Sequence, residues 1–154
     1  MSRVGWLFAQ MARIVGAPLP LSRDADVPAV VTVTEDLVGA GQFWTRQYGR
    51  RNGFPQVIHS AKRFAGKTGL EEYLGCGLGM ALTVDGDDKA LHFRSAFYFL
   101  SILGLRIMIP AWLSPGSTTV THADLGDGNF AFVLELVHPW LGELICQSAV
   151  FRDG

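Results

Sequence analysis

Short runs of apolar and β-branched residues, separated by turns rich in Gly and Asp about every ten residues, fill the chain from Ala29 onward. In the clearest run, from Leu78 to Val84, large apolar residues alternate with small ones. This is the period of a strand that buries one face. The pattern predicts strands near residues 29–35, 42–48, 55–64, 70–84, 89–99, 104–109, 117–125, 129–138 and 143–151.

Two turn sequences predict how these strands are connected. The Asp-Gly-Asp-Asp run at 85–88 and the Gly-Asp-Gly-Asn run at 126–129 contain the residues that best accept a positive φ, so each predicts a hairpin. Short links force neighbouring strands to pair antiparallel. We therefore expect a single, mainly β domain over residues 1–154. Its antiparallel meander over residues 29–151 should form a curved sheet, half-barrel or barrel, with a two-sheet sandwich as the alternative.

The amino-terminal segment has a different period. Val4, Leu7, Met11 and Ile14 recur at helical spacing, which predicts an amphipathic helix over residues 4–15. Its apolar stripe needs a surface to cover, so we expect this helix to lie against the sheet.

The composition of the chain is more apolar and less charged than that of ordinary soluble domains. Apolar residues make up 49% of the chain and charged residues only 18%, against roughly a quarter in ordinary soluble domains. An internal cavity, a partner surface or a membrane contact would explain this, as would a well-packed β core. The uncharged stretch from Ser95 to Leu105 is about half the length of a transmembrane helix. No signal-peptide cleavage motif is evident, so we expect a cytoplasmic protein without a transmembrane segment.

Charge is unevenly distributed along the chain. The net charge of −1 argues against a nucleic-acid partner, yet no acidic residue lies between Asp36 and Glu71. This interval is either a solvated strand face or a site for an anion. Its basic residues are Arg46, Arg50, Arg51, His59, Lys62, Arg63 and Lys67.

Acidic, histidine and cysteine residues predict no catalytic residue, metal site or cofactor. Glu71 and Glu72 should point to opposite faces of a strand, so they cannot form an acid–base pair. Cys76 and Cys146 are expected to be lone buried thiols, with a chance disulfide as the alternative. The histidines lack ligand spacing and lie at His59, His92, His122 and His138.

A glycine-rich run, Gly75-Cys76-Gly77-Leu78-Gly79, lacks the spacing and the following helix of a phosphate-binding loop. In a strand, its three glycines would share one face. Such a stripe lets a strand bend, or lets a ligand approach the backbone.

Four motifs in order resemble a bacterial family, family 4166 of the domains of unknown function, over roughly residues 27–151. They are Trp44-x-Arg46-x-Tyr48-Gly49, Glu72-Tyr73-Leu74-Gly75, Leu105 through Ile109-Pro110-x-Trp112-Leu113-x-Pro115, and Asp127-Gly128-x-Phe130-x-Phe132-x-Leu134 continuing to Pro139-x-x-Gly142. Members of that family occur alone or behind a dinucleotide-binding domain of the saccharopine-dehydrogenase or epimerase kind. This chain departs from its relatives near the end, where Gln147-Ser148-Ala149-Val150 replaces a Tyr-Arg-Gly-Trp ending.

The first of these motifs contains a candidate binding residue. Trp44, Arg46 and Tyr48 share one face of a strand, so aromatic rings flank the guanidinium. The family pattern suggests Glu72 as its counter-ion. Arg46 would then belong either to a structural ion pair or to a site that meets a ligand carboxylate or phosphate.

Two functions from different classes follow from these features. The first is a non-catalytic barrel that binds an apolar or amphipathic anionic small molecule of the lipid or acyl type. Its ligand-binding residues would be Trp44, Arg46, Tyr48, Glu72, Arg50, Arg51, Lys62 and Arg63. The alternative, which rests on the resemblance, is an accessory protein-interaction domain of an NAD(P)-dependent oxidoreductase. A homo-oligomer is compatible with either function.

Overall fold

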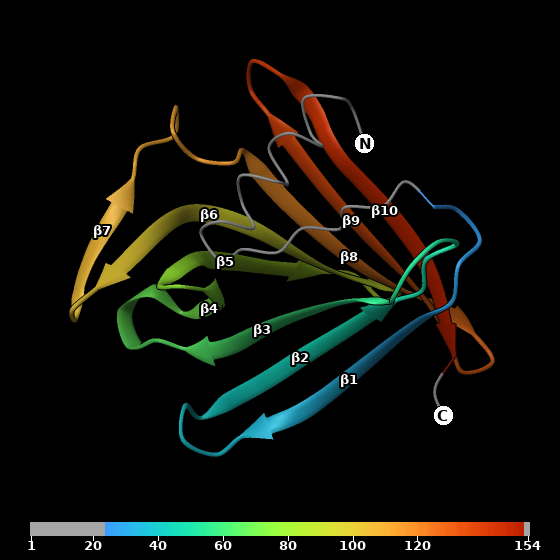
Figure 1. Cartoon of the computed structure of the whole chain (residues 1–154). Helices are drawn as coiled ribbons and strands as arrows, with labels where there is room; N and C mark the ends of the chain where they lie inside the picture. Colours follow the sequence, from blue (N-terminus) through green and yellow to red (C-terminus); the bar gives the residue numbers. More distant parts are fainter. Residues whose placement is uncertain (1–23, 153–154) are drawn as a thin grey trace.

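The computed structural model describes residues 24–152, which form a single antiparallel sheet (Figure 1). The predicted mainly β fold is confirmed. A short 3-10 helix, η1 (Gly66–Thr68), links two of the strands. The strands are β1 (Ala29–Asp36), β2 (Gly41–Tyr48), β3 (Gln56–Phe64), β4 (Leu70–Gly75), β5 (Leu78–Gly86), β6 (Ala90–Ile102), β7 (Leu105–Ile109), β8 (Ser117–Gly126), β9 (Asn129–His138) and β10 (Gly142–Arg152).

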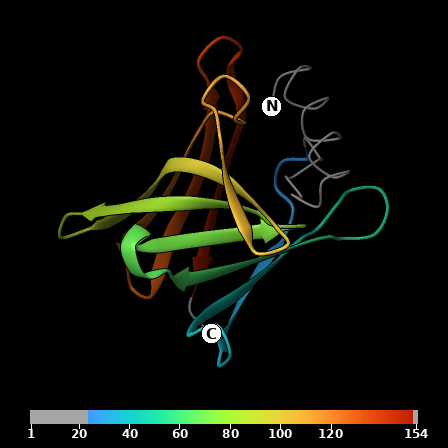
Figure 2. The ribbon, with the colours of Figure 1, turned by 90° about the vertical axis from the view of Figure 1, so that its left-hand side faces the viewer.

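The sheet follows chain order and curls into a nearly closed barrel, as Figures 1 and 2 show from two sides. Its order is β1-β2-β3-β4-β5-β6-β8-β9-β10, with β7 paired to β6 outside this path. The sandwich alternative is thus excluded, because every strand belongs to one sheet. Within the described residues the edge strands β1 and β10 do not pair with each other.

Strand β6 changes partner halfway along its length. Its residues 90–94 pair with β8, whereas its residues 98–102 pair with β7 on the same edge. The two partners therefore diverge at residues 95–97, and Figure 1 shows β7 standing apart from β8. We call this divergence the fork.

The turn sequences form the hairpins that the sequence predicts. Asp87 accepts hydrogen bonds from the backbone of Lys89 and Ala90 between β5 and β6. Between β8 and β9, Asp127 and Gly128 both have a positive φ. Both links are short, so the strands that they join pair antiparallel.

The prediction of one long strand over residues 70–84 is wrong. Gly75, Cys76 and Gly77 have φ values of 123°, 46° and 80°, so they form a turn between β4 and β5. Gly79 lies within β5, and a Cβ there would come within 2.5 Å of the Phe99 ring. The glycine makes room for an aromatic ring of this chain rather than for a ligand.

Buried apolar side chains form two groups. One contains Met80, Leu82 and Tyr98, with Leu70, Leu74, Phe93 and Ile109 packed against it. The other contains Leu136, Leu144 and Ile145 at the turn between β9 and β10.

Both cysteines are free, as predicted, but their predicted burial is wrong because both are exposed. Cys76 stands in the turn between β4 and β5. Cys146 lies opposite the exposed Glu135, so both point outward.

The predicted helix over residues 4–15 lies outside the described residues, so it stays a prediction. In the part of the chain that the structure covers, no helix is long and apolar enough to cross a membrane.

Candidate functional site

Three consecutive strands contribute charged side chains to one buried cluster. Lys62 on β3 and Glu72 on β4 are cross-strand partners, so their side chains share a face. Arg46 on β2 joins them, with its Nη2 3.0 Å from Glu72 Oε1, and Lys62 Nζ lies 3.9 Å from Glu72 Oε2. The Arg46–Glu72 pair that the family pattern suggests is confirmed. Lys62 is a second cation on the same carboxylate.

These three side chains are withdrawn from solvent. The side chains of Arg46, Lys62 and Glu72 are 12%, 7% and 4% exposed. Burial opposes ionisation of Glu72, but the charges of Lys62 and Arg46 outweigh it and lower the pKa of the carboxyl. Glu72 is therefore held as a carboxylate and is a poor proton donor near neutral pH. Burial, followed by the charge of Arg46, lowers the pKa of Lys62, against the opposing attraction of Glu72.

Aromatic rings surround the two cations. Lys62 Nζ lies 3.9 Å from the ring centre of Trp44 and 5.2 Å from that of Phe93. The guanidinium carbon of Arg46 lies 5.9 Å from the ring centre of Trp44. Cation–π contacts of this kind stabilise a charge that has lost its water. Tyr48 is also buried, and burial raises the pKa of its hydroxyl.

His122 on β8 approaches the cluster from a distant strand. Its ring centre lies 5.8 Å from that of Trp44 and 5.5 Å from that of Phe93. β2 and β8 are far apart in the sheet order, so side chains from them can meet only inside the curve of the sheet. Burial, and then the charges of Lys62 and Arg46, lower the pKa of His122 to about 4. The imidazole is therefore neutral at neutral pH.

We call Trp44, Arg46, Lys62, Glu72 and His122 the inner cluster. Sequence reasoning missed His122. The available signal was alternation in β8, which places His122 on the same face as the buried residues Thr118 and Val120.

Some polar atoms of this region lack a partner. Arg46 Nε, His122 Nε2 and Gln147 Oε1 are buried and make no hydrogen bond to any described residue. Buried polar atoms are nearly always paired, so each exception calls for an explanation. Here the unpaired atoms lie on or beside a group with two cations and one carboxylate.

The other predicted basic residues do not join the inner cluster. Arg63 neighbours Lys62 in β3 and so points to the opposite face, where its Nε lies 2.6 Å from Asp36 Oδ2. Arg50 and Arg51 are exposed beyond the end of β2, and the Arg51 backbone nitrogen donates to Asp24. The basic interval is therefore divided among three places.

A further ion pair, between Arg106 and Glu71, lies on the outer face of the sheet and was not expected from the sequence. Glu71 is fully buried and accepts hydrogen bonds from Arg106, Thr68 and Tyr73. The guanidinium of Arg106 lies 4.2 Å from the ring centre of Phe99. Glu71 and Glu72 thus point to opposite faces, as predicted. The carboxylate of Glu71 is fully paired, which is typical of a structural role.

No cluster of His, Cys, Asp or Glu within the described residues has the geometry to hold a metal ion. The chemistry of the inner cluster is therefore that of two buried cations, one of them incompletely paired, beside aromatic surface.

Comparison with known proteins gives one match. A family model described as a domain of unknown function, DUF4166, covers residues 1–151. No curated protein and no solved structure matches the chain.

Proposed function

The chain therefore belongs to the DUF4166 family, and we propose that its barrel is a non-catalytic binding domain for a small amphipathic anion. The observation that carries this proposal is the charge balance of the inner cluster. Among the described residues, Arg46 and Lys62 share a single carboxylate, Glu72, although all three side chains are buried. An unbalanced buried charge is costly unless a further group compensates it.

One of the unpaired atoms, Arg46 Nε, supports an anionic ligand, whereas Gln147 Oε1 can only accept a hydrogen bond. Arg46 Nε is a donor with a fixed direction, and it makes no hydrogen bond to a described residue. A ligand oxygen there would gain a charge-assisted hydrogen bond and would restore neutrality around Lys62. One surplus positive charge matches a monoanion such as a carboxylate better than a dianion.

The aromatic surroundings support an apolar portion in the same ligand. Trp44 is half-buried, and Phe93, Phe130 and Phe132 surround His122. An acyl chain that leaves a carboxylate near Arg46 would contact these rings and bury apolar surface, at about 25 cal/mol per Å².

Calorimetric titration with decanoate tests this proposal, with decanol as a probe of equal chain length and no charge. Lys62→Met keeps the apolar stem of Lys62, removes the surplus charge and leaves the Arg46–Glu72 pair in place. We expect it to weaken decanoate binding by about 10- to 100-fold, because the buried ligand carboxylate would lose the positive charge that compensates it. Lys67→Met is the matched control, since Lys67 is exposed in η1.

Equal affinities of both variants and the unchanged protein for decanoate would contradict the proposal, as would the absence of saturable binding. A preference for decanol would also contradict it. Added salt should weaken binding only slightly, because buried charges are poorly screened.

The alternative function, an accessory domain of an oxidoreductase, is supported by exposed apolar residues on the hairpin of β6 and β7. Leu103, Leu105 and Met108 are 99%, 70% and 62% exposed. Protein partners cover apolar patches of this kind. Co-purification of the chain with a saccharopine-dehydrogenase-like protein, abolished by Leu105→Glu, would favour this function.

A further inference from the structure

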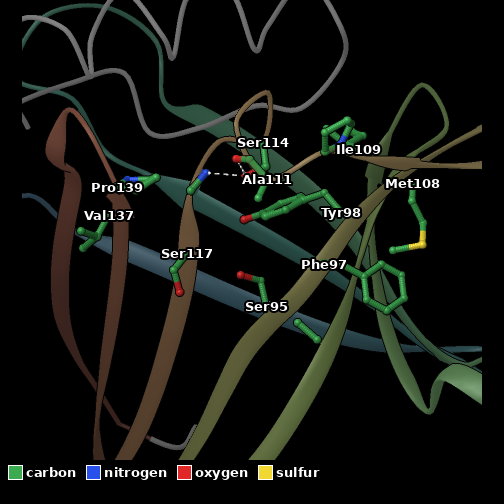
Figure 3. A pocket seen from close by; sticks show the side chains of 13 residues that line it. Ser95, Phe97, Tyr98, Met108, Ile109, Ala111, Ser114, Ser117, Val137 and Pro139 are labelled. Atoms are coloured by element: carbon green, nitrogen blue, oxygen red, sulfur yellow. Dashed lines mark hydrogen bonds between the residues drawn. The ribbon is translucent and has the colours of Figure 1, made fainter.

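The fork between β7 and β8 contains a pocket that is separate from the inner cluster. Its volume is about 780 Å³, within the range of small-molecule sites. β6 supplies one wall, the loop from Pro110 to Gly116 supplies another, and Val137 at the end of β9 contributes to the rim of this open pocket. Figure 3 shows Ser95, Tyr98, Ser114 and Ser117 gathered around the fork, with Phe97 and Met108 on the other side of β6.

Among the described residues, none that lines this pocket carries a charge. Phe97, Met108 and Ile109 present apolar surface on the side of β6 and β7, as Figure 3 shows. Trp112 and Leu113, within the loop that forms the opposite wall, are each 63% exposed. Apolar surface therefore continues from the pocket onto the neighbouring loop.

The polar groups of the pocket are hydroxyls. Ser95 Oγ accepts a hydrogen bond from the Thr118 nitrogen at 2.9 Å, where β8 leaves β6, and the Ser95 hydroxyl also interacts with the Tyr98 hydroxyl. The hydroxyls of Tyr98 and Thr118 lie 2.6 Å apart and satisfy each other. Ser117 is exposed and also lines the pocket. The exposed hydroxyl of Ser117 can therefore bind a hydroxyl or carbonyl oxygen.

We propose that the fork pocket binds an uncharged single-chain lipid that carries a hydroxyl or ester group, such as a monoacylglycerol. The volume fits an acyl chain together with a small polar head. The lining favours a neutral ligand over an ion, because a carboxylate would lose its water there without gaining a cation. The inner cluster has the opposite chemistry, so the two sites select different ligands.

Displacement of the uncharged dye Nile red by 1-monodecanoylglycerol, below its micelle concentration, tests the proposal on the full chain. Ala111 and Met108 are exposed lining residues, so changing them should spare the fold. Ala111→Trp fills the pocket, and Met108→Glu places a charge in its wall. Leu103→Glu is the matched control for Met108→Glu, because it adds the same charge at the exposed tip of the same hairpin.

We expect saturable displacement by 1-monodecanoylglycerol, weakened about tenfold or more by Ala111→Trp and by Met108→Glu and unchanged by Leu103→Glu. The proposal is overturned if displacement is not saturable, or if both Glu variants weaken it equally. It is also overturned if Lys62→Met abolishes monodecanoylglycerol binding together with decanoate binding, since the two ligands would then share the inner site. If only decanoate binding is absent, the proposed function fails and the proposal for the fork pocket stands. The failure of one proposal can therefore be distinguished from the failure of the other.

Discussion

Replacing Glu72 by Gln should destabilise the domain strongly, because it leaves Arg46 and Lys62 buried without their shared counter-ion. The Glu72 side chain is only 4% exposed, so water cannot take its place. Removing one partner from a buried ion pair costs about 3–5 kcal/mol. A domain of ordinary stability, about 5–15 kcal/mol, would lose a large part of its free energy of unfolding.

Urea denaturation followed by tryptophan fluorescence and by circular dichroism measures this loss. Glu143→Gln is the matched control, because Glu143 is exposed at the start of β10 and its loss should change stability by less than about 0.5 kcal/mol. The slope of the unfolding free energy against urea should be the same for all variants, so that the midpoint alone reports stability.

A double-mutant cycle with Lys62→Met refines the test. With Lys62 removed, Glu72→Gln leaves one buried cation instead of two, so its penalty should fall by about 1–3 kcal/mol. A loss below about 1 kcal/mol for Glu72→Gln alone would refute the reasoning, because that is the value of a solvated pair. An unchanged penalty in the Lys62→Met background would refute the coupling of the three charges.

Further predictions concern His122, Gly79 and the cysteines. Folding lowers the pKa of His122 from 6.5 to about 4. Between pH 4 and pH 6.5 the unfolded chain therefore binds a proton at His122 that the folded chain does not bind. The free energy of unfolding should therefore fall as the pH drops from 6.5 to about 4. The pKa shift alone corresponds to about 3 kcal/mol, and we expect about 2 kcal/mol because solvent screens the charge of this partly exposed ring. An NMR titration of the His122 ring near pH 6.5 would contradict this. Gly79→Ala should cost about 1–3 kcal/mol in urea denaturation, since the Phe99 ring must move, and an unchanged midpoint would exclude that contact. Both Cys76 and Cys146 should react with Ellman's reagent in the native protein, whereas protection of either would argue against its exposure.

Local patterns predicted most of the strands because side chains alternate in and out along them. The strand at 129–138 was predicted with the bounds that the structure has. The turn at Gly75, Cys76 and Gly77 was missed because alternation continues through it from Leu74 to Leu78. The positive φ at Cys76 belongs to the turn that lets β4 pair with β5. The alternation of residues along one strand does not show where such a turn begins.

The site was predicted in part for the same reason. Trp44, Arg46 and Tyr48 follow from the period of one strand, and the family pattern suggested Glu72. The proximity of His122 depends on the curvature of the whole sheet, because β8 meets β2 only when the barrel closes around them. The fork is likewise a tertiary feature, since nothing in the sequence of β6 indicates that it changes partner after residue 94.

In the proposed complex a ligand anion binds Arg46 Nε inside the barrel, where this atom has no hydrogen-bond partner among the described residues. The most direct test is the side-chain Nε–H resonance of Arg46 in a ¹H–¹⁵N spectrum of the full chain, assigned with Arg46→Lys and followed while decanoate is added. We predict a saturable downfield shift of this resonance, as expected for a proton that gains a charge-assisted hydrogen bond. Decanol should leave the resonance in place. A resonance that stays unchanged while other resonances report saturation with decanoate would contradict the account.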